Sequence, residues 1–175
     1  MMNSTEEGFS LIELLIVVAI ILIISAIAIP NLVRAKIAAN QSSAAASLRA
    51  LDSAATNYSS TYQDGYPPSL GVLGPSGGNA TCNAAGMIDP ILASGQKSGY
   101  QFTWVPGAEQ VAQAPAGCAA PGYEDMFSVT ATPFGFPTGT TFYCLDATGV
   151  IRESFAPIVA TAAGCPQAAI PIGDD

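Results

Sequence analysis

The sequence predicts an α+β fold, in which one long N-terminal helix packs on a C-terminal antiparallel sheet of three or four strands. Three observations predict it. Residues 11–29 are apolar except for Glu13 and Ser25. The following residues, up to position 63, repeat apolar side chains at steps of mainly three and four, as one buried face of a helix does. The C-terminal half contains short segments in which apolar and polar residues alternate, which is typical of strands.

The first element is a helix long enough to cross a membrane. Residues 11–29 would extend for about 28 Å at about 1.5 Å per residue, which is close to the hydrocarbon core of a bilayer, about 30 Å thick. A cleaved secretory signal peptide has a shorter apolar region and a basic flank before it. The flank here contains Glu6 and Glu7 and no Lys or Arg. We therefore expect the segment to stay in the membrane.

Glu13 lies two residues inside this apolar span. A carboxylate at the centre of a bilayer costs on the order of 2.5–3.5 kcal/mol, and less near the end of the span. Such an acid is either a functional residue or an end residue that reaches toward the lipid headgroups. Its position alone does not separate these two interpretations.

The residues around Glu13 favour the functional interpretation. The string Gly8-Phe9-Ser10-Leu11-Ile12-Glu13 closely resembles the processing site of type IV prepilins and pseudopilins. Pro30, after the apolar run, is similar to a proline common in the helices of that family. The resemblance implies that a dedicated peptidase cleaves after Gly8 and methylates Phe9, the new N-terminal residue. It also implies that Glu13 and Pro30 belong to a helix that assembles into a filament, and that the fold is pilin-like.

Cleavage would create an α-amino group on Phe9 in surroundings of low dielectric constant. In an isolated helix this amine lies about 6 Å from Glu13 along the axis, at about 1.5 Å per residue. The carboxylate of a neighbouring subunit could meet the amine more directly. An unpaired buried charge is costly and a paired one much less so. We therefore expect the pair to set the register between subunits.

Four regions follow from this organisation. Residues 1–8 are a leader peptide, 9–30 a transmembrane and filament-core helix, 31–63 the amphipathic half of the long helix, and 64–175 a globular head. Pro30 removes one backbone donor, so we expect a kink or a local loss of helix near it. The amphipathic half presents one apolar stripe to the head, formed by Ile37, Ala44, Leu48, Leu51, Ala55, Tyr58 and Tyr62.

The head is predicted to contain a short helix followed by strands. Asp89-Pro90 opens a short helix to about Ser94, with Asp89 as the N-cap. Four segments alternate as strands do: Tyr100–Val105, Met126–Thr132, Thr141–Leu145 and Gly149–Arg152. Residues from Pro157 onward are expected to form an irregular tail.

Cys82, Cys118, Cys144 and Cys165 all lie beyond the apolar segment and form no Cys-x-x-Cys pair. Zinc and redox motifs are therefore unsupported, and an even number of cysteines in an exported domain indicates two disulfides. Four cysteines allow three connectivities. We favour Cys144–Cys165, which would tie the tail to the sheet, together with Cys82–Cys118 between two loops.

Composition excludes several classes of function. The chain contains no histidine, so a Ser-His-Asp or Cys-His catalytic site cannot form, and we expect no enzymatic activity, catalytic residue, metal or cofactor. The net charge of −8 disfavours nucleic-acid binding. An enzyme on a membrane anchor and a soluble domain with an uncleaved anchor remain minor alternatives.

The resemblance implies a pilin, the structural subunit of a type IV pilus filament. The alternative is a pseudopilin of a type II secretion system, whose family more often has a calcium site near the C-terminus, where Asp174 and Asp175 stand here. Implied partners are other copies of the chain, the prepilin peptidase, an inner-membrane assembly platform with its ATPase, and membrane lipid. The implied location is the inner membrane, crossed once with the N-terminus in the cytoplasm, and then an extracellular pilus.

Overall fold

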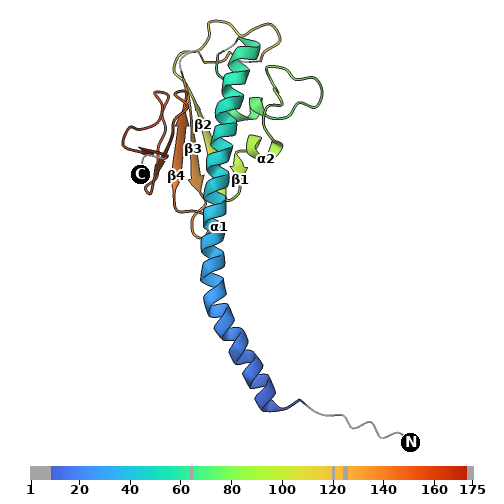
Figure 1. The fold of residues 1–175 in the computed structure, drawn as a ribbon. Coiled ribbons are helices and arrows are strands. Elements are labelled where there is room, and N and C mark those ends of the chain that lie inside the picture. The colour runs from blue at the N-terminus through green and yellow to red at the C-terminus, as the bar shows by residue number, and fades with distance from the viewer. Residues whose placement is uncertain (1–8, 64, 120, 124–125, 173–175) are drawn as a thin grey trace, which may run out of the picture. The chain divides into compact units, whose positions relative to one another are not determined.

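A computed structural model of the chain describes residues 9–63, 65–119, 121–123 and 126–172 (Figure 1). The chain divides into two compact units, Met1–Lys36 and Ile37–Asp175. Helix α1, Leu11–Tyr62, supplies the apolar segment of the first unit and continues as the first element of the second. The predicted leader, residues 1–8, lies outside the described residues.

Helix α1 continues through Pro30. The expected alternatives there were a kink or a local loss of helix, and no helix is lost, because every residue from 11 to 62 is helical. Proline removes a single backbone donor, and the hydrogen bonds on both sides of Pro30 hold the helix together.

The C-terminal half of α1 buries one face, as predicted from its apolar stripe. Leu48, Leu51 and Tyr58 are completely buried, whereas Ile37 and Tyr62 at the two ends of the stripe are half-buried. Seven residues of the helix are buried in all among those described: Ala44, Ser47, Leu48, Leu51, Ala54, Ala55 and Tyr58. The small residues among them let the helix approach the sheet closely.

The sheet is antiparallel and its strands are neighbours in chain order, β1 to β6. Its strands are β1 (Gln96–Lys97), β2 (Tyr100–Pro106), β3 (Phe127–Pro133), β4 (Phe142–Asp146), β5 (Ile151–Ser154) and β6 (Ile170–Pro171). The α+β fold is confirmed, but six strands replace the three or four expected. The additional strands, β1 and β6, are two-residue strands at the edges, too short to show an alternating pattern.

The sheet has a core on each face. Side chains on one face pack against α1, among them Val129 and Leu145. Those on the other face, including Cys144, pack with Ile158, Cys165 and Ala169. The segment after β5 was expected to be an irregular tail. It is irregular up to Ala169 as expected, but it also covers this second face and adds β6 to the edge, because the apolar residues of β4 would otherwise be exposed to water.

Two short helices complete the head. Helix α2, Pro90–Ala93, begins as predicted: the Asp89 side chain accepts a hydrogen bond from the Leu92 amide, and Pro90 occupies the first turn. The 3-10 helix η1, Leu70–Leu73, buries both of its leucines against the main core.

Candidate functional site

The start of helix α1 is the candidate site. Phe9 and Ser10 precede the helix, and the ring of Phe9 is exposed. Glu13 lies in the first turn, and the backbone N–H of Ser10 donates a hydrogen bond of 3.0 Å to its Oε2. The acid therefore folds back over the helix N-terminus and satisfies one of the amides that an α-helix leaves without an internal partner.

The bond between Ser10 and Glu13 was missed in the sequence analysis, although a signal was present. Ser10-Leu11-Ile12-Glu13 has the spacing of a capping box, in which a glutamate at the third helical position accepts from the N–H of the N-cap residue. The carboxylate thus lies close to the backbone of Ser10, just before the first helical residue. That Glu13 pairs with the amine of a neighbouring subunit stays a prediction.

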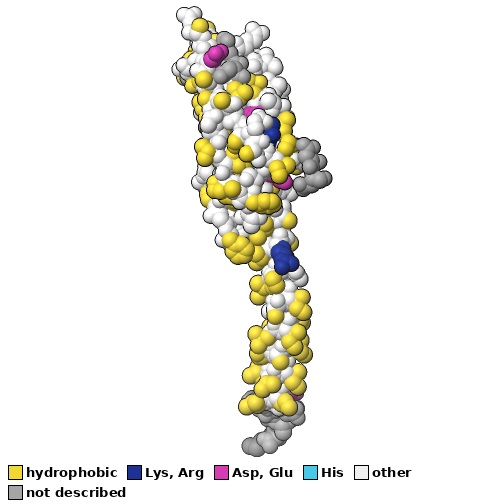
Figure 2. Space-filling model, turned by 90° about the vertical axis from the view of Figure 1, so that its left-hand side faces the viewer, with side chains coloured by type: hydrophobic (Ala, Val, Ile, Leu, Met, Phe, Trp, Pro, Cys, Tyr) yellow, Lys and Arg dark blue, Asp and Glu magenta, His cyan; other side chains and the backbone are white. Residues whose placement is uncertain are grey.

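The first half of α1 has no buried face. Its large apolar side chains, from Leu11 to Leu32, are all exposed within this chain (Figure 2). By its length and composition, helix α1 is long and apolar enough to cross a membrane. No residue of its most apolar 18-residue stretch is buried. Among the predicted site residues, Pro30 lies in this half and Gly8 lies outside the described residues.

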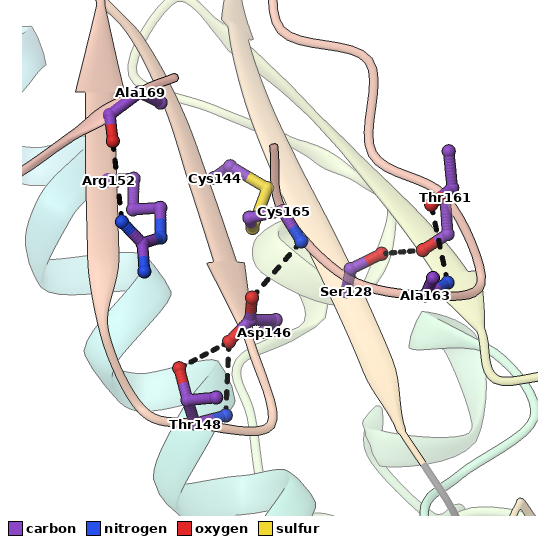
Figure 3. The surroundings of a disulfide bond; sticks show 9 residues. All are labelled: Ser128, Cys144, Asp146, Thr148, Arg152, Thr161, Ala163, Cys165 and Ala169. Atoms are coloured by element: carbon purple, nitrogen blue, oxygen red, sulfur yellow. Dashed lines mark hydrogen bonds between the residues drawn. A yellow bond between two sulfur atoms is a disulfide. The ribbon is translucent and has the colours of Figure 1, made fainter. Parts of the chain in front are cut away.

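The two disulfides are Cys82–Cys118 and Cys144–Cys165, which are the pairs favoured from the sequence. Cys144–Cys165 joins β4 to the C-terminal segment on the second face of the sheet (Figure 3). Cys82–Cys118 joins two loops beside the end of α1, where the Tyr58 hydroxyl donates to the Cys82 carbonyl.

Asp146 lies next to the Cys144–Cys165 disulfide and is 4% exposed. Its carboxylate accepts hydrogen bonds from the amides of Thr148 and Cys165, at 3.0 and 3.1 Å, and from the Thr148 hydroxyl (Figure 3). Burial by itself would raise the pKa of Asp146, but these hydrogen bonds and the nearby Arg152 outweigh it and lower the pKa. The Asp146 side chain thus connects the β4–β5 turn to the C-terminal segment through hydrogen bonds.

Nothing in the described part of the chain suggests catalysis. No group of three or more acids and cysteines there could hold a metal ion. Asp174 and Asp175, considered above as possible calcium ligands, lie outside the described residues. Four hollows in the described part of the head are lined by head residues, and none of these four includes the start of α1.

Comparisons with known proteins agree with the geometry at the start of α1. Residues 3–29 match the family model of the prokaryotic N-terminal methylation motif. The type IV major pilin protein PilA of Myxococcus xanthus (strain DK1622) is 43% identical over 107 residues, which cover 53% of this chain and 48% of the relative. The chain therefore spans about half the length of the curated relative that it matches.

No solved structure matches the chain significantly. The methylation motif, the helix behind it and the likeness to a major pilin nevertheless agree with one another. Pilins are structural proteins rather than enzymes, which is consistent with a chain without histidine. On these grounds the chain resembles the type IV pilin family, in its N-terminal motif and over about half of its length.

Proposed function

We propose that this chain is a structural subunit of a type IV pilus filament, cleaved after Gly8, methylated on Phe9 and polymerised through the first half of helix α1. One observation carries the proposal: the methylation motif covers residues 3–29, and the apolar first half of helix α1 buries no large side chain within its own chain. Such a surface needs an apolar partner outside the chain. Lipid can fill that need before assembly, and the same helix of other copies can fill it afterwards.

Glu13 is proposed to be the assembly residue of this helix. In a filament core it would neutralise the amine of Phe9, because two opposite charges in an apolar medium are tolerated only as a pair. The hydrogen bond from the Ser10 amide holds the carboxylate at the start of its helix, where the Phe9 amine of a neighbouring subunit would have to meet it.

Processing and export complete the proposal. The subunit is inserted with its N-terminus in the cytoplasm and its head outside, trimmed by a prepilin peptidase, and drawn into the filament by an inner-membrane platform and its ATPase. The two disulfides of the head support an oxidising compartment for Ile37–Asp175. A pseudopilin of a secretion system would share the same motif, but the curated relative is a major pilin.

Intact-mass measurement on filaments sheared from cells tests the proposal. The expected mass is that of a chain beginning at Phe9, with one added methyl group and two disulfides. Gly8→Val is a matched variant that should block cleavage and leave the longer chain in the membrane. Sheared material without this chain, or a mature chain that begins elsewhere, would refute the proposal.

A further inference from the structure

One end of the globular unit presents aromatic side chains to solvent. Phe134 and Phe136, in the loop between β3 and β4, are 58% and 79% exposed. Phe155 is also exposed. It lies at the same end of the sheet, because the preceding residue, Ser154 on β5, pairs with Phe142 at the start of β4. Figure 2 shows hydrophobic side chains gathered at the lower end of this unit.

The backbone of this loop is held firmly although its two rings are not. The Asn40 side chain donates to the Thr138 carbonyl at 2.8 Å, and Gln41 donates to the Thr141 hydroxyl at 3.0 Å. The Phe134 amide donates to the Gly99 carbonyl at 3.0 Å. The rings are therefore presented by an anchored loop and need no rearrangement to meet a partner.

The opposite end of the same unit carries a recess. Its volume is about 260 Å³, and it is lined by Tyr62, by residues 81–82 and by residues 115–118. The Cys82–Cys118 disulfide joins its two loops, and Asn83 donates to the Gly117 carbonyl at 2.8 Å while accepting from the Ala119 amide at 2.7 Å. The recess is thus built by crosslinked loops.

The two ends lie too far apart to meet within one chain. Asn40, which holds the aromatic loop, and Tyr62, which lines the recess, are 22 residues apart on helix α1. That separation is about 33 Å at about 1.5 Å per residue. Figure 1 shows the β3–β4 loop and the end of α1 at opposite ends of the globular unit.

Charge also favours another copy as the partner of each end. The chain carries a net charge of −8, so copies repel one another wherever acidic surfaces meet. Residues 126–145, which include the aromatic loop, contain no charged residue, and neither do residues 65–88 and 110–123 around the recess. Side chains of these segments can therefore meet between copies without bringing two like charges of their own together.

We propose that Phe134 and Phe136 of one subunit pack against the Tyr62 and 115–118 recess of another, as a head-to-tail contact between globular units. A contact between two different surfaces of identical chains does not close on itself unless the rotation forms a ring, and otherwise it propagates as a helical filament. The contact rests on the proposed filament function, to which it adds a second interface besides the one between the apolar helices.

Photo-crosslinking in sheared filaments tests this contact. Replacing Phe136 by p-benzoylphenylalanine keeps an aromatic side chain and creates a crosslinker on illumination. The expected product is a dimer whose linked peptides join position 136 to residues 115–118, which one chain cannot form across about 33 Å. Adducts with lipid or with another segment, or filaments with no adduct, would overturn the proposal.

Substitutions test the same contact by yield. Phe134→Ser with Phe136→Ser should lower the filament yield about tenfold or more, because two phenyl rings lose their burial. Ile91→Ser is the matched control, since Ile91 is an exposed apolar residue in neither the loop nor the recess, and its yield should not change. Equal yields for both variants would refute the contact.

A charge exchange makes the pairing specific. Phe136→Lys and Ala116→Glu should each lower the yield alone, and the two together in one chain should restore much of it, because opposite charges would then meet between copies. No recovery in the double variant would argue against the pairing. If the unmodified chain forms no filaments, the proposed function is refuted together with the contact. If the unmodified chain forms filaments and none of these substitutions changes the yield, only the contact is refuted.

Discussion

The two halves of helix α1 have the same backbone conformation but differ in how their side chains are buried. In the first half, Leu15 is 60% exposed like its apolar neighbours, and Glu13 interrupts an otherwise apolar surface. In the second half, apolar residues such as Leu51 lie on one face and are fully buried against the sheet. The first half is apolar all round, and the second is amphipathic.

This difference shows that two parts of one helix can require different surroundings. A helix that is apolar on every side needs an apolar medium around it, whereas an amphipathic helix needs one partner surface. The second half finds that surface in its own chain. The first half must find lipid or other subunits, so substitutions in the two halves should act on different measurements.

The largest effect is expected from Glu13→Gln in the apolar half. Removing one partner of a buried charge pair costs about 3–5 kcal/mol, so filament yield should fall about 100-fold or more. Glutamine can still accept the Ser10 hydrogen bond, because a capping box uses either residue. Processed subunit in the membrane should therefore stay at the parental level, while sheared filaments are lost.

Glu153→Gln is the control for Glu13→Gln, because it removes one negative charge from the head, on strand β5. It should leave both the membrane pool and the filament yield unchanged. Glu13→Asp keeps the charge with a shorter reach and should give an intermediate yield. If Glu13→Gln assembles like the parent, Glu13 is an end residue without a role in register.

A leucine-to-alanine substitution in each half of α1 tests whether the two halves contribute differently to the stability of the head. Leu51→Ala removes a fully buried side chain and should lower the free energy of unfolding of the head by about 2–5 kcal/mol. Leu15→Ala should change that free energy by less than about 0.5 kcal/mol, because Leu15 contacts no core of the head. Denaturant unfolding of both variants in detergent micelles measures the difference, and similar losses would contradict the division.

Loss of the C-terminal disulfide should act on one face of the sheet only. Replacing Cys144 and Cys165 by serine should cost the head about 3 kcal/mol, as expected for a closed loop of this size. Hydrogen exchange should rise in residues 155–170 and stay low in residues 48–58 of α1. Serine at Cys82 and Cys118 is the comparison, and it should instead loosen the loops at the end of α1. Equal exchange throughout the head would refute this separation.

The smallest effect concerns Asp146 and pH. Its pKa is lowered in the folded head, so the unfolded chain binds its proton more readily and stability falls as pH falls. The contribution should be fully present above the ordinary range of an aspartate, about pH 4, and lost as the pH drops through the lower folded value. Asp146→Asn should cost about 2 kcal/mol at neutral pH, and should flatten the acid limb of the stability profile. An unchanged acid limb would contradict this role of Asp146.

The elements that carry a long or regular pattern could be predicted from the sequence. The apolar run and the stripe behind it indicated helix α1, because side chains three and four positions apart share one face. Strands β2 to β5 showed alternation, and Asp89-Pro90 indicated the start of α2 through cap chemistry that is local to the chain. The motif around Gly8 and Glu13 is also local, since it lies within a few consecutive residues.

Which surfaces are covered and which are exposed could not be predicted from the sequence and became clear only from the folded chain. Strands β1 and β6 exist because a neighbouring strand offers free hydrogen-bonding groups, and two residues carry no pattern that could indicate this. The tail is irregular up to Ala169 as expected, but the sequence did not indicate that it covers the second face of the sheet. Phe134 and Phe136 would be assigned to a core by their type, but they are exposed. Burial depends on what packs from distant parts of the chain, and that information appears only when the chain is folded.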